Sequence, residues 1–573
     1  MSEEIRITTE RVDDIPLLLG QMRRMGLPQV LNLCFPMHGN WGGLWIGDVV
    51  MMWLAHLLSE GDHRLNHVLP WVERRQQTLT ACIGEVVRPQ EVSDERLAEV
   101  LRALADDLHW GYCEEHLAER LLRVYDLQPR AVRVDTTTVS SYGAVSAEGL
   151  LQFGHSKDHR PDLPQVKVLL ATLDPLGLPV ATEVLSGERA DDPLYTPAIG
   201  RVRLSLRRRG LLYLGDCKMA ALATRASLQQ AGDFYLCPLP ATQVPPAVQA
   251  AYVAPVTALT QTLTPLSRTA ADGTTAVIAH GYECTQTLHA TLGGQEITWE
   301  ERRLVVRSVS AARTAAEALR ARLAQAQAAL AALSVPRQGK RRLADRASLT
   351  QAASAVLAQY RGADLLQITL RDEVHERPVR AYRGRPATVR RTHHLHVEST
   401  VETEALAHAL SLLGWRVYGS THPVATLSLE QAVHAYRDEY IVERSLGRLK
   451  GHPLSLAPLY LQRSAHITGL VRLLSLALRV LTVLEFVVRR QVAQTTEPVR
   501  GLYAGAPKRA TLRPTAEQIL GAFREITLTV VYEAQGTRGH LSALSALQLR
   551  LLTLLGLSPG LYTDLPTLCA EPP

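Results

Sequence analysis

Three acidic residues occupy positions whose residue type and surroundings suit metal chemistry. Asp135 falls inside the Val- and Thr-rich segment 131–140, a strand-like sequence in which Asp is disfavoured. Asp216 follows the short apolar segment 211–214, and Glu443 lies on a long predicted helix. Carboxylates on two strands and one helix can converge above one edge of a sheet, where their oxygens suit hard divalent cations. Two such ions about 3.5–4 Å apart activate a nucleophile and stabilise a leaving oxygen in phosphoryl transfer.

Each of these acids also has an ordinary structural interpretation. Most Asp and Glu side chains are solvated at the surface or cap helices, and Asp216 precedes a predicted helix, where it fits an N-cap. The residue types alone therefore leave both a surface role and a metal-binding role open.

The predicted helix 429–450 places further polar residues beside Glu443. The residues that share one face of this helix are Tyr436, Glu439, Glu443 and Lys450. A stripe of basic residues beside that face consists of Arg437, Arg444 and Arg448. Such a face could hold a metal ion and bind DNA phosphates together. The spacing fits an ordinary salt-bridged helix surface equally well.

A polar loop precedes the strand-like segment 166–173 and adds more basic side chains. Its members are His155, Lys157, His159 and Arg160. Binding residues are often carried on loops held by a rigid scaffold, so this loop is a candidate contact for DNA. A solvated connection between two elements explains it as well.

The elements that must position these residues begin near residue 130, where the hydrophobic pattern changes from helical to strand-like. Three predicted strands joined by short turns are 131–140, 166–173 and 178–185. The elements that follow are a helix at 194–209, a strand at 211–214, a helix at 218–231 and a strand at 234–237. This order predicts an α/β core, with a mixed sheet covered by helices.

Changes of pattern along the chain predict five regions. They are an all-helical N-terminal domain (1–125) that could bind DNA ends, a first part of the core (126–237), an insertion (238–410), a second part of the core (411–490) and a helical C-terminal tail (491–573). Within the insertion a β-rich half precedes an Ala-rich helix. Its apolar seam is Leu319, Leu323, Ala326, Leu330 and Leu333. The seam is short, so we expect a helical hairpin within one chain rather than a coiled-coil dimer.

The bulk composition is that of an ordinary globular protein with a mild excess of basic residues. The net charge is +6, from 62 basic and 56 acidic residues among 573. This excess alone barely favours a nucleic-acid partner, but basic residues cluster at 201–209, 337–346 and 383–396. Several separate clusters favour a polyanionic partner.

The sequence also favours a cytoplasmic protein. Its seven cysteines show no CxxC pairing, which is typical of neither a zinc module nor a disulfide framework. The N-terminal segment has no signal-peptide pattern. The most apolar stretch, 470–488, contains Arg472, Arg479 and Glu485, so a buried helix explains it better than a membrane span.

The motifs resemble those of DDE transposases of bacterial insertion sequences. Tyr436, Glu443 and Lys450 follow the spacing of the Y-R-E-K signature of the insertion-sequence-four group, and Asp135 and Asp216 match its first two acids. The segments that look most similar to the branch numbered sixteen-thirty-four are VDTTTV (134–139), GHSKDHRPDLPQVKVLLATLDPLGLPV (154–180), LSGERADD (185–192) and THPVATLS (421–428). The resemblance covers roughly residues 90 to 490.

This resemblance implies an RNase H-like core interrupted by an inserted domain. It implies two Mg²⁺ ions, replaceable by Mn²⁺, with Asp135 bridging both while Asp216 and Glu443 each hold one. It also implies that the substrates are double-stranded DNA ends with terminal inverted repeats and a target DNA, bound by a homodimer at the nucleoid without a small-molecule cofactor. In hairpin-forming relatives an aromatic residue of the insertion stacks on a flipped base. Trp299 is the candidate here, although a buried Trp of the β-rich half explains it too.

Two alternatives stay open at this point. Glu439 occupies the signature's Arg position, which is compatible with a catalytically impaired, DNA-binding relic of a transposase. A metal-dependent phosphohydrolase of the haloacid-dehalogenase kind would use Asp135 as its nucleophile. That chemistry needs a second Asp two residues on, where this chain has Thr137.

Overall fold

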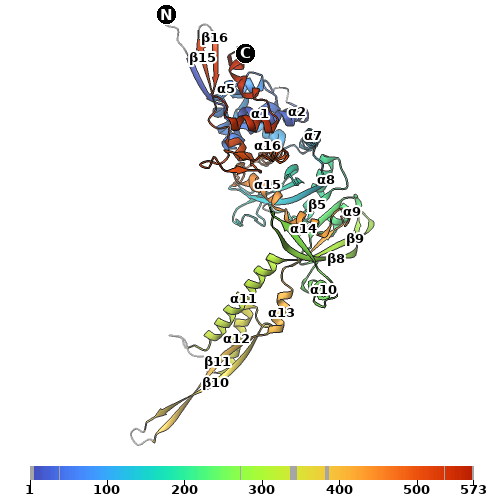
Figure 1. The fold of residues 1–573 in the computed structure, drawn as a ribbon, viewed down its shortest axis with the longest axis vertical. Helices are drawn as coiled ribbons and strands as arrows, with labels where there is room; N and C mark the ends of the chain where they lie inside the picture. The colour runs from blue at the N-terminus through green and yellow to red at the C-terminus, as the bar shows by residue number, and fades with distance from the viewer. Residues whose placement is uncertain are drawn as a thin grey trace. The chain divides into compact units, whose positions relative to one another are not determined.

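The computed structural model describes residues 6–37, 39, 41–270, 273–335, 345–380, 386–533 and 536–570. The chain has a mixed α/β fold and divides into two compact units (Figure 1). The first consists of Met1–Cys237, His289–Ile297 and His434–Pro573, and the second of Pro238–Leu288 and Thr298–Val433. The inserted unit thus starts where the sequence predicts, but it ends at Val433 rather than at residue 410.

A mixed sheet forms the centre of the first unit. Its strands are β2 (Ala131–Ser140), β3 (Gln165–Asp174), β4 (Leu178–Ser186), β5 (Leu212–Leu214) and β6 (Phe234–Pro238), in the order β4-β3-β2-β5-β6. Strands β2, β3 and β4 pair antiparallel, whereas β5 runs parallel to β2 and β6 parallel to β5. All five strands were predicted from the strand-like segments of the sequence.

Helices cover this sheet. The covering helices are α8 (Tyr195–Leu206), α9 (Leu222–Gln230), α15 (Tyr440–Lys450) and α16 (Ser464–Thr495). Helix α16 packs on β4, α15 on β2 and α8 on β3 and β4. Residues 165–173 of β3 are all buried, which explains why its sequence is almost continuously apolar.

The N-terminal region is mainly helical, as expected. Its helices are α1 (Ile15–Met25), α2 (Leu27–Cys34), α3 (Ile46–Glu60), α4 (Val68–Glu73), α5 (Gln76–Ile83), α6 (Asp94–Leu104) and α7 (Asp107–Tyr125). The prediction of an all-helical region is nevertheless wrong, because β1 (Arg6–Arg11) pairs antiparallel with β15 (Thr527–Glu533) near the other end of the chain. A partner so distant in sequence leaves no local signal.

The C-terminal region also contains strands, so a purely helical tail is wrong. Its elements are β13 (Val499–Arg500), β14 (Ala510–Thr511), α17 (Ala516–Gly521), β15, β16 (Gly536–Leu541), α18 (Ala546–Leu555), α19 (Gly560–Thr563) and α20 (Leu565–Ala570). The apolar stretch 470–488, which was predicted as a buried helix, lies within one helix, α16, of 32 residues. No helix within the described ranges is long and apolar enough to span a membrane.

The second unit combines a curved sheet with a helical hairpin and a ribbon. Its elements are α10 (Pro246–Thr257), β7 (Thr264–Thr269), β8 (Thr275–Leu292), β9 (Gln295–Ser308), α11 (Val309–Ala332), α12 (Arg346–Tyr360), β10 (Leu366–Val379), β11 (Thr388–Val401), α13 (Thr403–Ser411) and β12 (Trp415–Ser420). The sheet order in this unit is β12-β9-β8-β7, and among the described strands β10 pairs only with β11. Strand β12 falls within residues 411–490, the region that the sequence assigned to the second part of the core.

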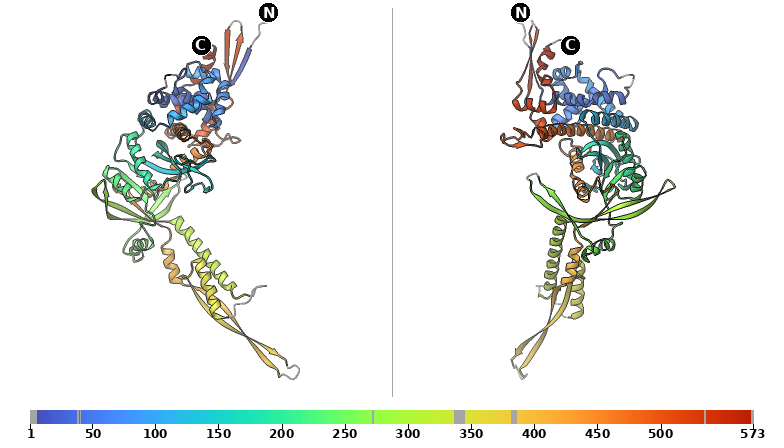
Figure 2. Two further views of the ribbon diagram at one scale, coloured as in Figure 1. Left: turned by 180° about the vertical axis from the view of Figure 1, so that it is seen from behind. Right: turned by 45° about the vertical axis from the view of Figure 1, so that its right-hand side comes forward.

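The predicted apolar seam of α11 is confirmed. Leu319, Leu323 and Leu330 are buried in a cluster that also contains Leu349 of α12 and Leu366 of β10. Helices α11 and α12 lie side by side at the base of the ribbon (Figure 2). The seam therefore closes within one chain, as its short length indicated.

Candidate active site

The pairing of β2 with β5 brings Asp135 and Asp216 to neighbouring positions. The parallel register aligns Arg133 with Leu214, so two further residues along each strand lead to the two aspartates. Both lie on the side where β5 ends. Crevices at the carboxyl ends of parallel strands are where ligands bind in open α/β sheets.

The surroundings of Asp135 disfavour its negative charge in the absence of a cation. Burial raises the pKa of Asp135 to about 6, and the negative charges of Asp216 and Glu439 contribute to this rise. The Lys157 ammonium opposes it, as does the hydrogen bond from the Thr136 backbone N–H to Asp135 Oδ1 at 2.7 Å. A cation held between these carboxylates would relieve their mutual repulsion.

Asp216 is held by two donors on one of its oxygens. The Tyr195 hydroxyl donates to Asp216 Oδ1 at 2.6 Å, and the Lys218 backbone N–H donates to the same atom at 2.9 Å. Helix α9 starts later, with Ala221 as its N-cap, so Asp216 is not a helix cap. Tyr195 is buried at the start of α8, and it fixes the orientation of this carboxylate.

The predicted helix 429–450 is two helices, α14 (Leu429–Arg437) and α15, separated by Asp438 and Glu439. Glu439 lies in a narrow cleft with Asp135, Gly215 and Tyr436. Burial raises the pKa of Glu439, and the charges of Glu443 and Asp216 raise it further, whereas a hydrogen bond with Tyr436 lowers it. The carboxylate that lies beside the two aspartates is thus Glu439.

Glu443 is exposed and lies one helical turn beyond Glu439. The Glu443 backbone N–H donates to the Glu439 carbonyl at 3.2 Å, so helical geometry continues across the two residues. They therefore lie on the same side of the chain, as the sequence spacing predicts. The role of Glu443 as third metal ligand stays a prediction.

Lys157 reaches the site from the polar loop. Its Nζ donates to the Thr136 carbonyl at 2.6 Å and lies 4.0 Å from Asp135 Oδ1 and 3.7 Å from Asp191 Oδ2. Lys167 pairs with Asp191 at 2.5 Å. Burial works to raise the pKa of Asp191, but the two ammonium groups hold it below its usual value. Lys157 thus lies between the carboxylates of Asp135 and Asp191.

Lys450 links the end of α15 to β2 and the polar loop. Its Nζ pairs with Asp158 and donates to Thr137 Oγ1 at 3.2 Å. Ser140 at the end of β2 donates to Asp158 Oδ2 at 3.2 Å. Lys450, the lysine of the Y-R-E-K signature, therefore contacts β2, the strand that contains Asp135.

Two other predicted DNA-binding arginines have structural partners. Arg444 pairs with Glu485 of α16 at 2.6 Å, and Arg448 pairs with Glu485 and, at 2.8 Å, with Glu517. The side chain of Arg448 is only 10% exposed. These contacts fasten α15 to α16 and α17, and they favour the salt-bridged interpretation of the stripe. Arg437 lies half-buried at the end of α14.

The remaining residues of the polar loop are exposed, and exposed aromatic rings lie beside them. His155, His159 and Arg160 are exposed, and Arg160 pairs with Asp162 at 2.7 Å. Nearby, Tyr142 and Tyr460 are 57% and 70% exposed, with their rings stacked at a centroid distance of 5.7 Å. Exposed rings of this kind can stack on nucleotide bases.

Trp299 does not offer such a ring. It lies on β9 in the second unit and is only 4% exposed. The structure agrees with the interpretation of Trp299 as a buried residue of the β-rich half. A base-stacking role for it finds no support in this geometry.

The sequence indicated some of the site's residues and missed others. It singled out Asp135, Asp216 and Lys157, but not Tyr195 or Asp191. Asp191 falls within the LSGERADD segment, which was the only available signal for it. Nothing local distinguishes Tyr195, because its role depends on where α8 packs.

The donor set suits a hard divalent cation, although the described residues do not form a closed metal site. Among them, no group of three or more His, Cys, Asp or Glu side chains is close enough to hold an ion. Asp135 and Asp216 each use Oδ1 in the hydrogen bonds described above. Carboxylate oxygens are the ligands that Mg²⁺ prefers, usually one or two of them together with substrate phosphates and water. The two aspartates fit that requirement.

Comparisons with known proteins do not assign this chain to a family. No protein-family model matches the chain. No curated protein matches it either. A solved structure that is similar to it is the cryo-EM structure of the piggyBac transposase synaptic complex with hairpin DNA, with a TM-score of 0.33 and 8% identity. That similarity covers 89% of this chain and 79% of the other.

Proposed function

We propose that this protein is a DDE-type DNA transposase of an insertion sequence. The observation that carries the proposal is the juxtaposition of Asp135 and Asp216 at the ends of adjacent parallel strands, with the 439–443 segment beside them. Three antiparallel strands followed by two parallel ones support an RNase H-like core, and the second unit is the inserted domain. The resemblance of the sequence motifs supplies the reaction class.

Two Mg²⁺ ions, or Mn²⁺ in their place, would be held by Asp135, Asp216 and the signature glutamate Glu443. The ions would activate water and then a 3′-hydroxyl and stabilise the leaving oxygen in an in-line displacement. Tyr195 holds the Asp216 carboxylate in place through its 2.6 Å hydrogen bond. Glu439 adds negative charge that favours cation binding.

The lysine and arginine side chains around the acidic residues would bind the DNA backbone. Lys157 lies 4.0 Å from Asp135, Lys450 of α15 contacts Thr137 farther along β2, and Arg160 lies in the same polar loop as Lys157. Lysine and arginine contacts to phosphates position a duplex without reading its sequence. The substrates are the double-stranded ends of the element and a target DNA, and the acting species is a homodimer.

The two alternatives receive less support. In a phosphohydrolase of the haloacid-dehalogenase kind, the second acid would stand at Thr137, which instead accepts a hydrogen bond from Lys450. A DNA-binding relic would not need the intact pair of aspartates or the tyrosine that orients one of them.

The function is tested by incubating the full-length protein with DNA that carries the two ends of its own element. We expect Mg²⁺ or Mn²⁺ to produce breaks at the ends that leave 3′-hydroxyl groups, and joining of those ends to a target plasmid. Chelation of the metal should stop both reactions. Binding of the ends without any cleavage, under every divalent ion tried, would support the relic instead.

A further inference from the structure

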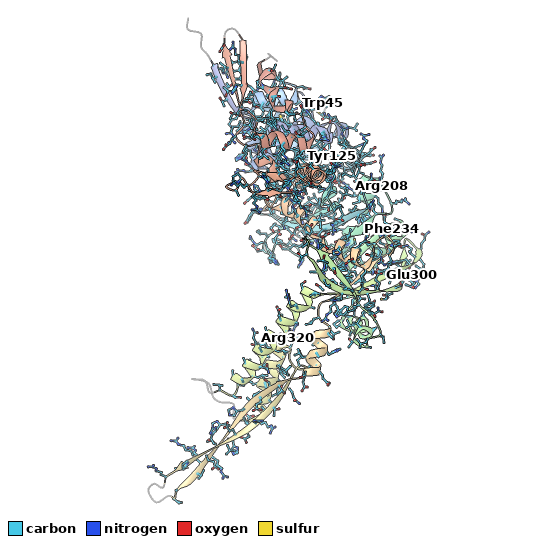
Figure 3. The ribbon with its side chains drawn as sticks, viewed as in Figure 1. Trp45, Tyr125, Arg208, Phe234, Glu300 and Arg320 are labelled. Carbon is cyan, nitrogen blue, oxygen red and sulfur yellow. The ribbon has the colours of Figure 1, made fainter. Side chains whose placement is uncertain are left out.

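The ribbon formed by β10 and β11 in the second unit has a supported base and an unsupported distal part. At the base, Leu366 and Val397 are buried in the cluster with α11 and α12. From Arg371 to the end of β10, every residue is exposed. Figure 3 shows side chains on both faces of the distal ribbon, with no other described element of this unit packed on them. Two-stranded ribbons without such packing are marginally stable in water.

The distal ribbon carries a pair of like charges in direct register. Arg377 of β10 lies opposite Arg390 of β11, and directly paired residues point to the same face. Neither arginine has an acidic partner among the described residues, whereas Arg371 pairs with Glu398 at 3.1 Å and Arg391 with Glu376 at 2.6 Å. Like charges directly opposite each other destabilise a ribbon. An anionic ligand would remove that repulsion.

We propose that the distal ribbon binds the phosphate backbone of double-stranded DNA through Arg377 and Arg390. This inference rests on the proposed function for its choice of ligand. A two-stranded ribbon is narrow enough to enter the major groove of B-form DNA, and guanidinium groups match phosphate oxygens in geometry and charge. Arg380 follows the end of β10 as another exposed cation without an acidic partner in the described part of the chain.

The charges of the distal ribbon distinguish a polyanion from other kinds of partner. A protein partner would usually cover an apolar patch, but the exposed distal positions alternate charged, polar and single apolar residues. A metal ion is not indicated either, since the ribbon's histidines pair with carboxylates: His393 with Asp372 at 2.8 Å and His396 with Glu373 at 3.1 Å. Unpaired arginines on a narrow ribbon fit a polyanion best.

The test measures DNA binding without cleavage. Full-length Asp135→Asn protein is titrated with a mixed-sequence DNA duplex at several salt concentrations, with and without Arg377→Gln and Arg390→Gln. Each phosphate contact adds about 0.9 to the slope of log affinity against log salt, so losing two should reduce the slope by about 1.8. The matched control is Arg371→Gln, on the same strand and already paired with Glu398, and it should leave the slope unchanged.

A charge-preserving variant separates loss of contact from misfolding. Arg377→Lys with Arg390→Lys should restore most of the salt slope, whereas the glutamine pair should not. An unchanged slope and affinity in the glutamine pair would overturn the proposal. So would unchanged DNA binding with altered self-association, which would make the ribbon a contact between copies. If the unmodified protein shows no salt-dependent DNA binding, the proposed function fails as well.

Discussion

Glu439 and Glu443 lie one helical turn apart, and either of them could be the third metal ligand beside Asp135 and Asp216. Glu443 has the motif's spacing to Lys450, while Glu439 lies in the cleft beside Asp135. We expect Glu443→Gln to eliminate cleavage because it removes a metal ligand. Glu439→Gln should keep cleavage but require several-fold more Mg²⁺, because it removes only a neighbouring negative charge. Cleavage assays of both variants across a Mg²⁺ titration compare them directly.

The opposite pattern would assign the ligand differently. If Glu439→Gln is inactive at every Mg²⁺ concentration and Glu443→Gln cleaves normally, the third metal ligand is Glu439 and not Glu443. Circular dichroism of both variants controls for folding. Glu404, an acid at the start of α13 in the second unit, offers a matched control as Glu404→Gln.

A buried acid at the start of α1 should make stability depend on pH. Asp14 is 3% exposed and accepts a hydrogen bond from Ser59 at 2.6 Å, and burial raises its pKa to about 6. The folded state therefore holds the proton more tightly than the unfolded state. The stability this gives is complete below the unfolded pKa of 3.8 and is lost as the pH rises through about 6.

Asp14→Asn removes this titration. We expect the variant to be more stable than the parent above pH 7, by an amount on the order of 3 kcal/mol, and the difference to vanish near pH 4. Urea denaturation at both pH values measures it. A difference that is the same at both pH values would show that Asp14 is not protonated preferentially in the folded protein.

The sequence could indicate Asp135 because a carboxylate within a Val- and Thr-rich strand is conspicuous. It could not reveal that Arg448 turns toward Glu485, because that ion pair depends on how α15 packs on α16. Tyr195 was missed for the same reason. Residue type and local pattern thus indicate which side chains suit the chemistry. Tertiary contacts decide which of those side chains lie in the site and which form ion pairs elsewhere.

At the scale of elements, α16 is fastened to the rest of the first unit by buried ion pairs. Arg479 of α16 pairs with Glu114 of α7 at 2.8 Å, and the two side chains are 2% and 1% exposed. Arg201 of α8 also pairs with Glu114, at 3.2 Å. These contacts explain why charged residues interrupt an otherwise apolar helix.

Removing one partner of this pair should cost much more than removing a surface charge. Glu114→Ala leaves Arg479 buried without its carboxylate, which destabilises by about 3–5 kcal/mol. Glu99→Ala, in an exposed pair with Arg102, should cost about 1 kcal/mol or less. Denaturant unfolding of the two variants gives the comparison. Equal losses would mean that the α7–α16 pair is solvated in solution.

Elements with a strong periodic or apolar pattern were predictable, and those defined by distant pairing were not. The strands β2–β6 of the mixed sheet and helix α11 follow from their patterns. The helix at 429–450 was predicted as continuous because no Gly or Pro marks the interruption at Asp438 and Glu439. The ribbon was missed because its exposed half has charged residues on both faces, so no alternation of apolar and polar residues appears.

At the scale of the whole molecule, the sequence indicated an interrupted core, and the division into two units agrees with it at Pro238. The pairing of β1 with β15 joins segments at opposite ends of the sequence, which no window of residues reveals. The proposed catalytic residues lie in the first unit, and the proposed DNA contact lies on the ribbon of the second. These assignments are separable, since each has variants that leave the other's residues intact.

Metal-dependent cleavage by aspartate variants that still bind DNA tests whether Asp135 and Asp216 hold the catalytic metal ions. Asp135→Asn and Asp216→Asn should each lose cleavage of the element's ends in Mg²⁺ and in Mn²⁺ while retaining the affinity of the parent for those ends. Asp364→Asn, at an exposed position in the second unit, should cleave like the parent. Normal cleavage by either active-site variant would contradict the assignment of the two aspartates as metal ligands.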